Sequence, residues 1–424
     1  MSEEQLVNKP ALDIEGAAKR LKPVVNHTPL QFNANLSRKY QCRVYLKRED
    51  LQIVRSYKLR GAYNMMSQLT AAQLAKGVVC ASAGNHAQGF AYSCKKLGVK
   101  GVVFMPIPSP QQKVSQTKMF GDEFVEVKLV GDTFDDTAIA AKAYTQSHDM
   151  TFIPPFDHPS IIEGQATVGV EILEDIKTLT TDPIDYIFVP IGGGGLCAGV
   201  GYYFDQHSPN TKVIGLEPEG APSMFWALKS GAPVELENID KFVDGASVKR
   251  VGDYNFSICK DVIDDMHLVP EGKICTTILQ MYNEEAIVVE PAGAMSIAAL
   301  DDYADKIKGK SIVCIVSGGN NDIARMQEIK ERSLIYEGLK HYFLIQFAQR
   351  PGSLKDFVNK VLGPNDDITR FEYIQKHNKE GGPALVGLEL KSKDDYDALI
   401  VNMKRNQINY NEINKDDNIY GYLI

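Results

Sequence analysis

An alternation of two kinds of segment between residues 40 and 316 limits the fold of this chain more than any other feature. Short runs rich in Val and Ile carry few polar residues, as strands covered on both faces do. They lie at 98–105, 186–191, 212–218 and 311–316. Ala-rich amphipathic stretches such as 85–98 and 137–148 predict helices between them. This order predicts an α/β fold with mostly parallel sheets. About 300 residues are too many for one small sheet, so we expect two lobes with a cleft between them.

The order of segments changes after about residue 320. Residues 321–338 predict a charged helical connector. From 339 to 424 the pattern predicts a strand, a helix, two strands joined by a turn at 377–382, a helix and a strand, which is an α+β unit of the β-α-β-β-α-β type. The unit has no cluster of reactive side chains, so we interpret it as a regulatory or assembly module. The predicted domains are a catalytic region at 1–320, the connector at 321–338 and a small domain at 339–424.

Charge and cysteine usage argue against several kinds of partner and site. The net charge of 46 − 54 = −8 argues against nucleic acid or an anionic membrane as the main partner. No apolar run approaches the ~18–20 residues of a membrane span, and the first residues have no apolar signal-peptide region. Seven scattered cysteines, mostly inside apolar runs, predict buried free thiols in a reducing cytoplasm. Without a CxxC or HExxH motif a zinc site is not expected.

Lys58, in the stretch "SYKLRGA" at 56–62, is the first residue that suggests chemistry. It stands among apolar residues, close to Arg55 and Arg60. One interpretation is a solvated helix start with Ser56 near the cap. The other is an amine whose pKa is lowered by the two arginines and by partial burial, ready to react with a carbonyl cofactor.

Three further stretches follow apolar runs and are rich in small residues. Gly192 to Gly195 and Leu196 follow a strand and open a helix, an arrangement typical of a phosphate site. A dinucleotide site fails on spacing, because GxGxxG requires glycine at Cys197. Residues 82–89, "SAGNHAQG", predict a second anion loop, and 317–322, "SGGNND", place the Ser317 hydroxyl at the ligand-binding edge of a parallel sheet. The alternative interpretations are a flexible turn for residues 192–196, a capped helix start for 82–89 and a Gly-rich turn for 317–322.

Together the four stretches supply an amine, a phosphate cradle, an anion loop and a hydroxyl. Pyridoxal phosphate offers one group to each of them: an aldehyde, a phosphate, a phenolate and a pyridine nitrogen. We therefore predict this cofactor at a single site.

Five motifs resemble the pyridoxal-phosphate threonine dehydratases of the tryptophan-synthase-β-like fold. They are "LKREDLQIVRSYKLRGAYNMM", "SAGNHAQGFA", "PPFDHPSIIEGQATVGVEI", "PIGGGGLCAGV" and "VSGGNND", and the resemblance covers roughly residues 20–320. The segment "FAQRPGSLKDFVNKVLGPNDDITRFEYIQK" looks like the regulatory domain of the biosynthetic enzymes, which make the first committed precursor of isoleucine. The resemblance implies deamination of L-threonine to 2-oxobutanoate and ammonia. It also implies isoleucine or valine as effectors and a tetramer.

The resemblance also implies residue roles. Lys58 is the Schiff-base lysine and proton shuttle, Asn85 binds the phenolic oxygen, and Ser317 meets the pyridine nitrogen. The phosphate is bound by Gly192, Gly193, Gly194, Gly195 and Leu196. The substrate carboxylate is bound by Ser82, Ala83, Gly84, Asn85 and His86.

Serine racemases share this fold, and two departures separate the chain from them. They carry a serine base where this chain has Ala83, so racemisation is disfavoured. Their divalent-metal site needs two carboxylates six residues apart, and here Glu217 is followed by Ser223. No divalent metal is expected, but a monovalent cation near Glu217, Ala221 and Ser223 stays open. L-Serine is the hardest substrate to reject, because one methyl group is worth only ~1–3 kcal/mol. Three other functions are weaker alternatives. His86 argues against a cysteine synthase, and the lack of an added basic cluster for a phosphorylated substrate argues against a threonine synthase. The intact Lys58 argues against a non-catalytic amino-acid sensor.

Overall fold

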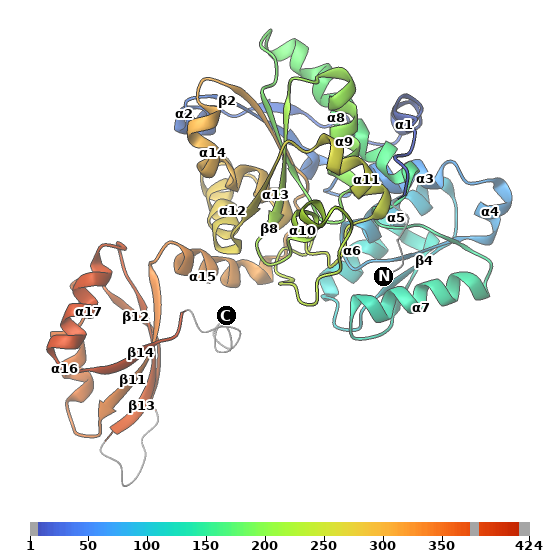
Figure 1. The fold of residues 1–424 in the computed structure, drawn as a ribbon. Helices are drawn as coiled ribbons and strands as arrows, with labels where there is room; N and C mark the ends of the chain where they lie inside the picture. Colours follow the sequence, from blue (N-terminus) through green and yellow to red (C-terminus); the bar gives the residue numbers. More distant parts are fainter. Residues whose placement is uncertain (1–6, 374–380, 415–424) are drawn as a thin grey trace. The chain divides into compact units, whose positions relative to one another are not determined.

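Two sheets form the larger of two compact units in the computed structural model, which describes residues 7–373 and 381–414 (Figure 1). The larger unit comprises Met1–Glu271 and Met281–Asp322, and the smaller comprises Gly272–Gln280 and Ile323–Ile424. The boundary expected after residue 320 did not anticipate that Gly272–Gln280 groups with the C-terminal part.

The main sheet of the larger unit is mostly parallel and has six strands. Only its edge strand β1 is antiparallel to its neighbour. Every residue of the central strand β10 is buried, which explains why this run has no polar alternation. The order of strands is β1 (Leu30–Phe32), β2 (Arg43–Arg48), β10 (Ser311–Val316), β7 (Tyr186–Pro190), β8 (Lys212–Pro218) and β9 (Asp265–Val269).

The second sheet is smaller and entirely parallel. Its order is β5 (Val125–Leu129), β4 (Gly101–Met105), β3 (Val78–Ala81) and β6 (Thr151–Phe152). Alternate residues of β3 face opposite sides, since Val78 and Cys80 pack in one apolar cluster and Val79 and Ala81 in another. The first cluster includes α5 (Asn85–Leu97) and α6 (Gln111–Gly121), and the second includes α7 (Phe134–Ser147).

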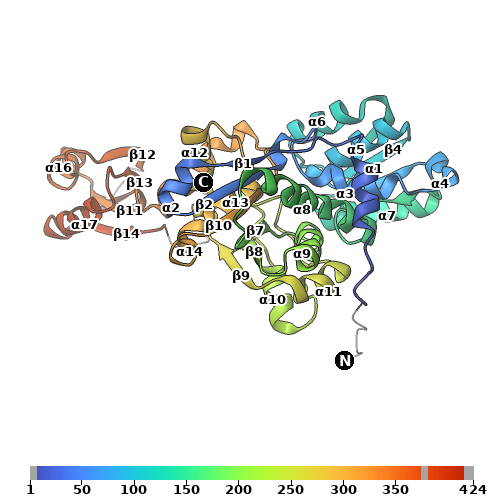
Figure 2. The same ribbon diagram turned by 90° about the horizontal axis from the view of Figure 1, so that it is seen from above.

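Helices cover both faces of the main sheet as well. Figure 2 shows α8 (Pro159–Leu179) and α9 (Gly195–His207) beside β7 and β8, where their apolar residues share one buried cluster with the strands. The opposite face packs against α13 (Pro291–Ala298). The other helices of this part are α1 (Ile14–Leu21), α2 (Ala34–Tyr40), α3 (Lys58–Met66), α4 (Ala71–Lys76), α10 (Ser223–Ser230), α11 (Asp253–Val262) and α14 (Leu300–Ile307), with 3-10 turns at η1 (Glu49–Leu51) and η2 (Asp122–Phe124). Helix α12 (Glu271–Glu285) contributes Gly272–Gln280 to the smaller unit. The predicted α/β fold with two lobes is confirmed.

The smaller unit contains the predicted β-α-β-β-α-β order, which is also confirmed. Its antiparallel sheet runs β12 (Asp367–Tyr373), β13 (Gly381–Glu389), β11 (Lys340–Ala348) and β14 (Asn409–Glu412). Helices α16 (Ser353–Lys360) and α17 (Asp395–Arg405) pack on it through Phe357, Leu399 and Met403. Before the sheet come η3 (Ile323–Arg325) and the connector helix α15 (Met326–Tyr336). Most of the predicted turn at 377–382 lies outside the described residues.

The seven cysteines are buried and unpaired, as predicted. Among the described residues, no helix combines the length and apolarity that crossing a bilayer demands.

Candidate active site

Lys58 begins α3, and its side chain is half-buried. Its Nζ donates to the carbonyl oxygen of Pro155 at 2.9 Å and lies 5.5 Å from the ring centre of Tyr57 and 6.0 Å from that of Phe156. Burial lowers the pKa of Lys58 to about 8, although the carboxyl of Glu290 opposes the shift. Roughly a tenth of the amine is therefore unprotonated at pH 7, and a nucleophile requires this neutral form.

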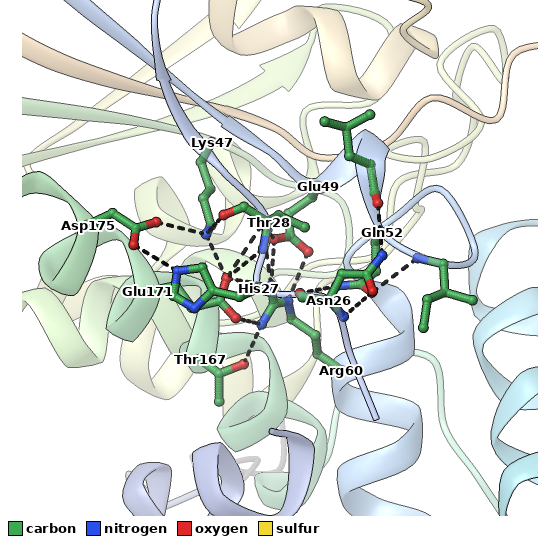
Figure 3. A network of polar contacts seen from close by, with 12 residues as sticks. Asn26, His27, Thr28, Lys47, Glu49, Gln52, Arg60, Thr167, Glu171 and Asp175 are labelled. Atoms are coloured by element: carbon green, nitrogen blue, oxygen red, sulfur yellow. Dashed lines mark hydrogen bonds and ion pairs between the residues drawn. The ribbon is translucent and has the colours of Figure 1, made fainter. Parts of the chain in front are cut away.

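Burial, one of the causes expected from the sequence, lowers this pKa, whereas the expected contribution of the neighbouring arginines is wrong. Arg60 has no exposed side-chain surface and forms ion pairs with Glu49 and Glu171, each with an N–O distance of 2.7 Å. Lys47 joins the same network, donating to Glu171 at 2.6 Å (Figure 3). The carboxylates neutralise the charge of Arg60, which instead anchors the first turn of α3.

Two glycines hold the first turn of α3 against its neighbouring helices. A Cβ on Gly89 of α5 would lie 2.9 Å from the Leu59 nitrogen and 3.0 Å from the Lys58 carbonyl carbon. A Cβ on Gly164 of α8 would lie 2.5 Å from the Arg60 carbonyl oxygen. The main chain of α3 is thus in direct contact with both helices, and this contact fixes the start of the Lys58 side chain.

The glycine loop ends at Gly194, which has a φ of 95° and precedes α9 without a side-chain cap. The carbonyl of Gly193 is held by α11 and its N-terminus: Asn255 Nδ2 donates to it at 2.7 Å, and the Gly252 amide does so at 3.1 Å. With this carbonyl held in this way, the uncapped N-terminus of α9 offers amides to an anion. The loop and helix therefore fit a phosphate group. The Leu196 side chain packs in the core, so only its backbone can contribute.

Phe156 connects this loop to Lys58. A Cβ on Gly193 would lie 2.3 Å from the Phe156 ring, so glycine is required for the ring to pack there. Pro155, whose carbonyl accepts from Lys58, directly precedes this phenylalanine.

Asn85 and the loop that begins at Ser317 meet on another side of the site. Asn85 Nδ2 donates to Glu290 Oε1 at 2.7 Å, and Asn320 Nδ2 donates to Asn85 Oδ1 at 2.7 Å. Ser317 is buried, and its carbonyl accepts from the amide of Tyr57 at 3.2 Å. All four predicted stretches therefore come together around Lys58.

Ser56 supplies a test of fit for the cofactor. Its hydroxyl is fully buried beside Gly318, with which its backbone forms a β-bridge, and it has no hydrogen-bond partner among the described residues. A buried hydroxyl without a partner costs about 1–3 kcal/mol, so a polar ligand atom is expected near it. A reactive amine, an anion cradle and this hydroxyl together fit pyridoxal phosphate.

The predicted substrate loop lies at the start of α5, where Ser82, Ala83 and Gly84 are half-buried. The Gly84 amide donates to Ser82 Oγ at 3.2 Å, and a Cβ on Gly84 would meet nothing within 4 Å. His86 is buried, and its Nε2 lies 3.0 Å from the Ile153 carbonyl oxygen. Burial, with help from the charge of Lys58, lowers the pKa of His86 to about 3, so the ring is neutral. The open space beside Gly84 suits a ligand.

Glu217 caps a helix. Its carboxylate accepts from the backbone amides of Met224 at 2.7 Å and Phe225 at 2.9 Å, and from the Ser223 hydroxyl at 3.3 Å. Within the described ranges no three His, Cys, Asp or Glu side chains are grouped as metal ligands would be.

Sequence reasoning did not assign Glu290, Asn320 or Phe156 to the site. Asn320 and Phe156 lie inside motifs that carry the family resemblance, but neither residue was assigned a role there. Glu290 lies in none, but an isolated acidic residue in the apolar run 286–298 is a usable signal, because charged residues are rarely buried without a partner.

Two family models match this chain. One, described as pyridoxal-phosphate dependent enzyme, matches residues 21–318. The other, described as C-terminal regulatory domain of threonine dehydratase, matches residues 331–423.

Individual proteins match over nearly the whole chain. The biosynthetic L-threonine dehydratase of Halalkalibacterium halodurans is 60% identical over 97% of this chain and 98% of its own. The corresponding protein of Bacillus subtilis is 57% identical over 96% of both chains.

Among solved structures, threonine deaminase isoform 2 of Solanum lycopersicum superposes with a TM-score of 0.70 at 40% identity, covering 77% of this chain and 96% of that one. Maize serine racemase gives a TM-score of 0.69 at 28% identity, covering 76% and 97%. Deaminases and racemases therefore share this fold, whereas the proteins that match over nearly the full length of the chain are threonine dehydratases. The chain belongs to the pyridoxal-phosphate-dependent biosynthetic threonine dehydratases, a family of lyases with a C-terminal regulatory domain.

Proposed function

We propose that this enzyme converts L-threonine to 2-oxobutanoate and ammonia, with Lys58 as its catalytic residue. The observation that carries the proposal is the position of the Lys58 amine. It is half-buried, its pKa is lowered to about 8, and it lies where the four loops converge.

Each loop would hold one part of the cofactor. Lys58 would bind its aldehyde, Asn85 its phenolic oxygen and Ser317 its pyridine nitrogen. The phosphate would lie on the backbone of Gly192, Gly193, Gly194, Gly195 and Leu196. When bound, pyridoxal phosphate supplies a covalent attachment for the substrate amine and an electron-withdrawing ring next to its Cα. Ser317 offers a neutral hydroxyl, which does not impose a protonated ring nitrogen.

The chain's own residues perform the remaining steps. The loop Ser82, Ala83, Gly84, Asn85 and His86 binds the substrate carboxylate and so orients the Cα–H bond. The freed Lys58 amine removes the α-proton, and the β-hydroxyl leaves with a proton as water. Hydrolysis of the released enamine takes up one water and yields 2-oxobutanoate and ammonia, so the balance needs no oxidant.

Regulation is the second part of the proposal. We infer that isoleucine or valine binds a hollow of about 240 Å³ in the C-terminal domain, at the end of β11 and beside α16. Asp356 lies there between Arg350 and Lys360, at 2.9 Å from each, and can meet an ammonium group while the two cations meet a carboxylate. Phe347 and Phe357 give the hollow an apolar wall for a branched side chain. The proposed domain limits stay at 1–320, 321–338 and 339–424.

The hollow can be tested in the full-length enzyme. Arg350→Ala should raise the isoleucine concentration for half-maximal effect at least about tenfold, the loss expected when a charge-assisted contact is removed. Lys391→Ala, an exposed cation outside the lining, should leave it within about twofold. An unchanged response in Arg350→Ala would place the effector elsewhere. Light scattering tests the tetramer that the family likeness suggests.

Product identification tests the catalytic proposal. Threonine should give 2-oxobutanoate and ammonia in equal amounts, and L-serine should be deaminated more slowly, because the pocket distinguishes them by one methyl group. Borohydride treatment followed by peptide mass spectrometry should place the reduced cofactor on Lys58. A tag on any other lysine contradicts the assignment.

A further inference from the structure

Glu290 is a buried carboxyl at the proposed cofactor site to which the catalytic proposal gives no role. It precedes α13 in extended conformation, and only 5% of its surface is exposed. Its amide donates to the Gly318 carbonyl at 3.2 Å, so the residue is fixed to the loop that begins at Ser317. A Cβ on Gly318 would lie 2.3 Å from Glu290 Oε1, which shows how closely the carboxyl packs on this loop.

The Asn85 amide is held between two partners. Its Nδ2 donates to Glu290 Oε1 at 2.7 Å, and its Oδ1 accepts from Asn320 Nδ2 at 2.7 Å. Asn320 is fixed in turn, because its Nδ2 also donates to the Val54 carbonyl at 2.9 Å. A side-chain amide carries two N–H hydrogens and one oxygen. Glu290 takes one hydrogen and Asn320 occupies the oxygen, so one hydrogen is left for a ligand.

A flip of the Asn85 amide would lose both contacts. Its oxygen would then face the Glu290 carboxyl, and its NH₂ group would face the NH₂ of Asn320. Two hydrogen bonds would become two repulsive contacts. The arrangement therefore permits only the orientation that presents an N–H to the site.

We propose that Glu290 is a positioning residue that, together with Asn320, orients Asn85 so that its free N–H faces the phenolic oxygen of pyridoxal phosphate. This inference rests on the role proposed above for Asn85. It adds two residues, one of them a titratable group, to the determinants of cofactor binding.

The surroundings of Glu290 give this contact a pH dependence. Burial raises the pKa of Glu290 to about 7, and the charge of Asp244 acts in the same direction. The Asn85 hydrogen bond, the Lys113 charge and an Asn320 backbone contact lower it, and Lys58 also faces the carboxyl. Above pH 7 the carboxylate accepts from Asn85, and charge-assisted hydrogen bonds are roughly twice as strong as neutral ones. Cofactor retention should therefore increase as pH rises from 6 to 8.

Cofactor release from the full-length holoenzyme on dilution, followed by absorbance, measures the effect without an activity assay. At pH 6, Glu290→Ala and Asn320→Ala should each weaken retention at least about tenfold, because Asn85 loses one partner. Glu290→Gln keeps an acceptor oxygen and should stay within about threefold of the parent at that pH. Between pH 6 and 8 the parent should bind more tightly, and the increase in Glu290→Gln should be smaller, because only the titration of Lys58 is left to cause it.

Glu217→Gln is a matched control. Glu217 is also a buried carboxyl whose pKa is raised to about 7. It caps α10, however, and has no contact with Asn85. This variant should keep the pH step. The proposal is overturned if Glu290→Ala retains the cofactor within threefold of the parent. It is also overturned if Glu290→Gln shows the same pH dependence of retention as the parent, a test that does not require the alanine variant to fold. Asn85→Ala distinguishes a failure of the Glu290 proposal from a failure of the role proposed for Asn85. If this variant retains the cofactor normally, the role of Asn85 itself is wrong.

Discussion

The Nζ of Lys58 lies 2.9 Å from the carbonyl oxygen of Pro155 and donates a hydrogen bond to it. A carbonyl oxygen accepts from an ammonium or from a neutral amine, so the contact positions the nitrogen in both protonation states. Among the described residues no carboxylate forms an ion pair with the lysine, and burial outweighs the opposing charge of Glu290 and lowers the pKa of Lys58 to about 8.

Attachment of the cofactor should follow the titration of this amine. With the pKa of Lys58 lowered from 10.5 to about 8, roughly a tenth of the amine is neutral at pH 7, against roughly 0.03% for an ordinary lysine. The rate at which stripped enzyme recombines with pyridoxal phosphate should rise from pH 6, reach half its maximum near pH 8 and level off above about pH 9. Stopped-flow absorbance at several pH values measures it, and a rate that keeps rising to pH 10 would contradict the lowered pKa.

Removal of the amine should abolish turnover but leave the fold intact. Lys58→Ala should lose ~10²–10⁴-fold or more in kcat, the usual contribution of a positioned acid–base group, together with the covalent attachment. Lys58→Arg keeps a charge but cannot act as a nucleophile, so it should be equally inactive. Assays of 2-oxobutanoate release, with circular dichroism as a folding check, distinguish a chemical loss from unfolding. Residual activity above a few per cent in either variant argues against Lys58.

A methyl group in the glycine loop should disturb the phosphate cradle. In Gly193→Ala the new Cβ would lie 2.3 Å from the Phe156 ring, so ring or loop must move. We expect a loss of about 1–3 kcal/mol in unfolding free energy and a large loss of cofactor affinity. Gly169→Ala, in the interior of α8, is the control. There the Cβ meets its nearest atoms at 3.5 Å, and the substitution should stabilise the helix by up to about 1 kcal/mol.

The buried network around Arg60 should be a major determinant of stability. Arg60→Met leaves the buried carboxylates Glu49 and Glu171 without their shared partner, and should cost about 3–5 kcal/mol. Lys95→Met removes one side of an exposed pair with Asp122 and should cost no more than about 1 kcal/mol. Denaturant unfolding of the two variants side by side measures the difference. Equal losses would mean that the network contributes little beyond packing.

The sequence was informative wherever a loop follows a buried strand. Small residues after the runs at 186–191 and 311–316 indicated ligand-binding edges, because parallel strands end together and their amides converge there. The four stretches do meet around Lys58. The β-α-β-β-α-β order of the C-terminal unit could also be predicted, because the apolar residues repeat with the period of a strand in its strands and with the period of a helix in its helices.

Contacts between side chains far apart in sequence could not be predicted from the sequence. Glu290 and Asn85 are separated by 205 positions, and only the fold brings them to 2.7 Å. Arg60 was interpreted as a charge acting on Lys58, because the two residues are neighbours in sequence. Its carboxylate partner Glu171, 111 positions away, reverses that interpretation. Charges in a motif can be assigned an electrostatic effect only when their partners are known.

The close contacts of Gly89 and Gly164 with the first turn of α3 constrain how the site can open and close. Leu59 and Arg60 cannot slide past these glycines, because main-chain atoms already touch there without intervening side chains. A displacement of the first turn of α3 would therefore have to carry α5 and α8 with it, and the approach of the Lys58 amine to a ligand is left to the torsions of its own side chain. Variants that alter these contacts should change the catalytic rate even though the altered residue does not touch the reacting atoms.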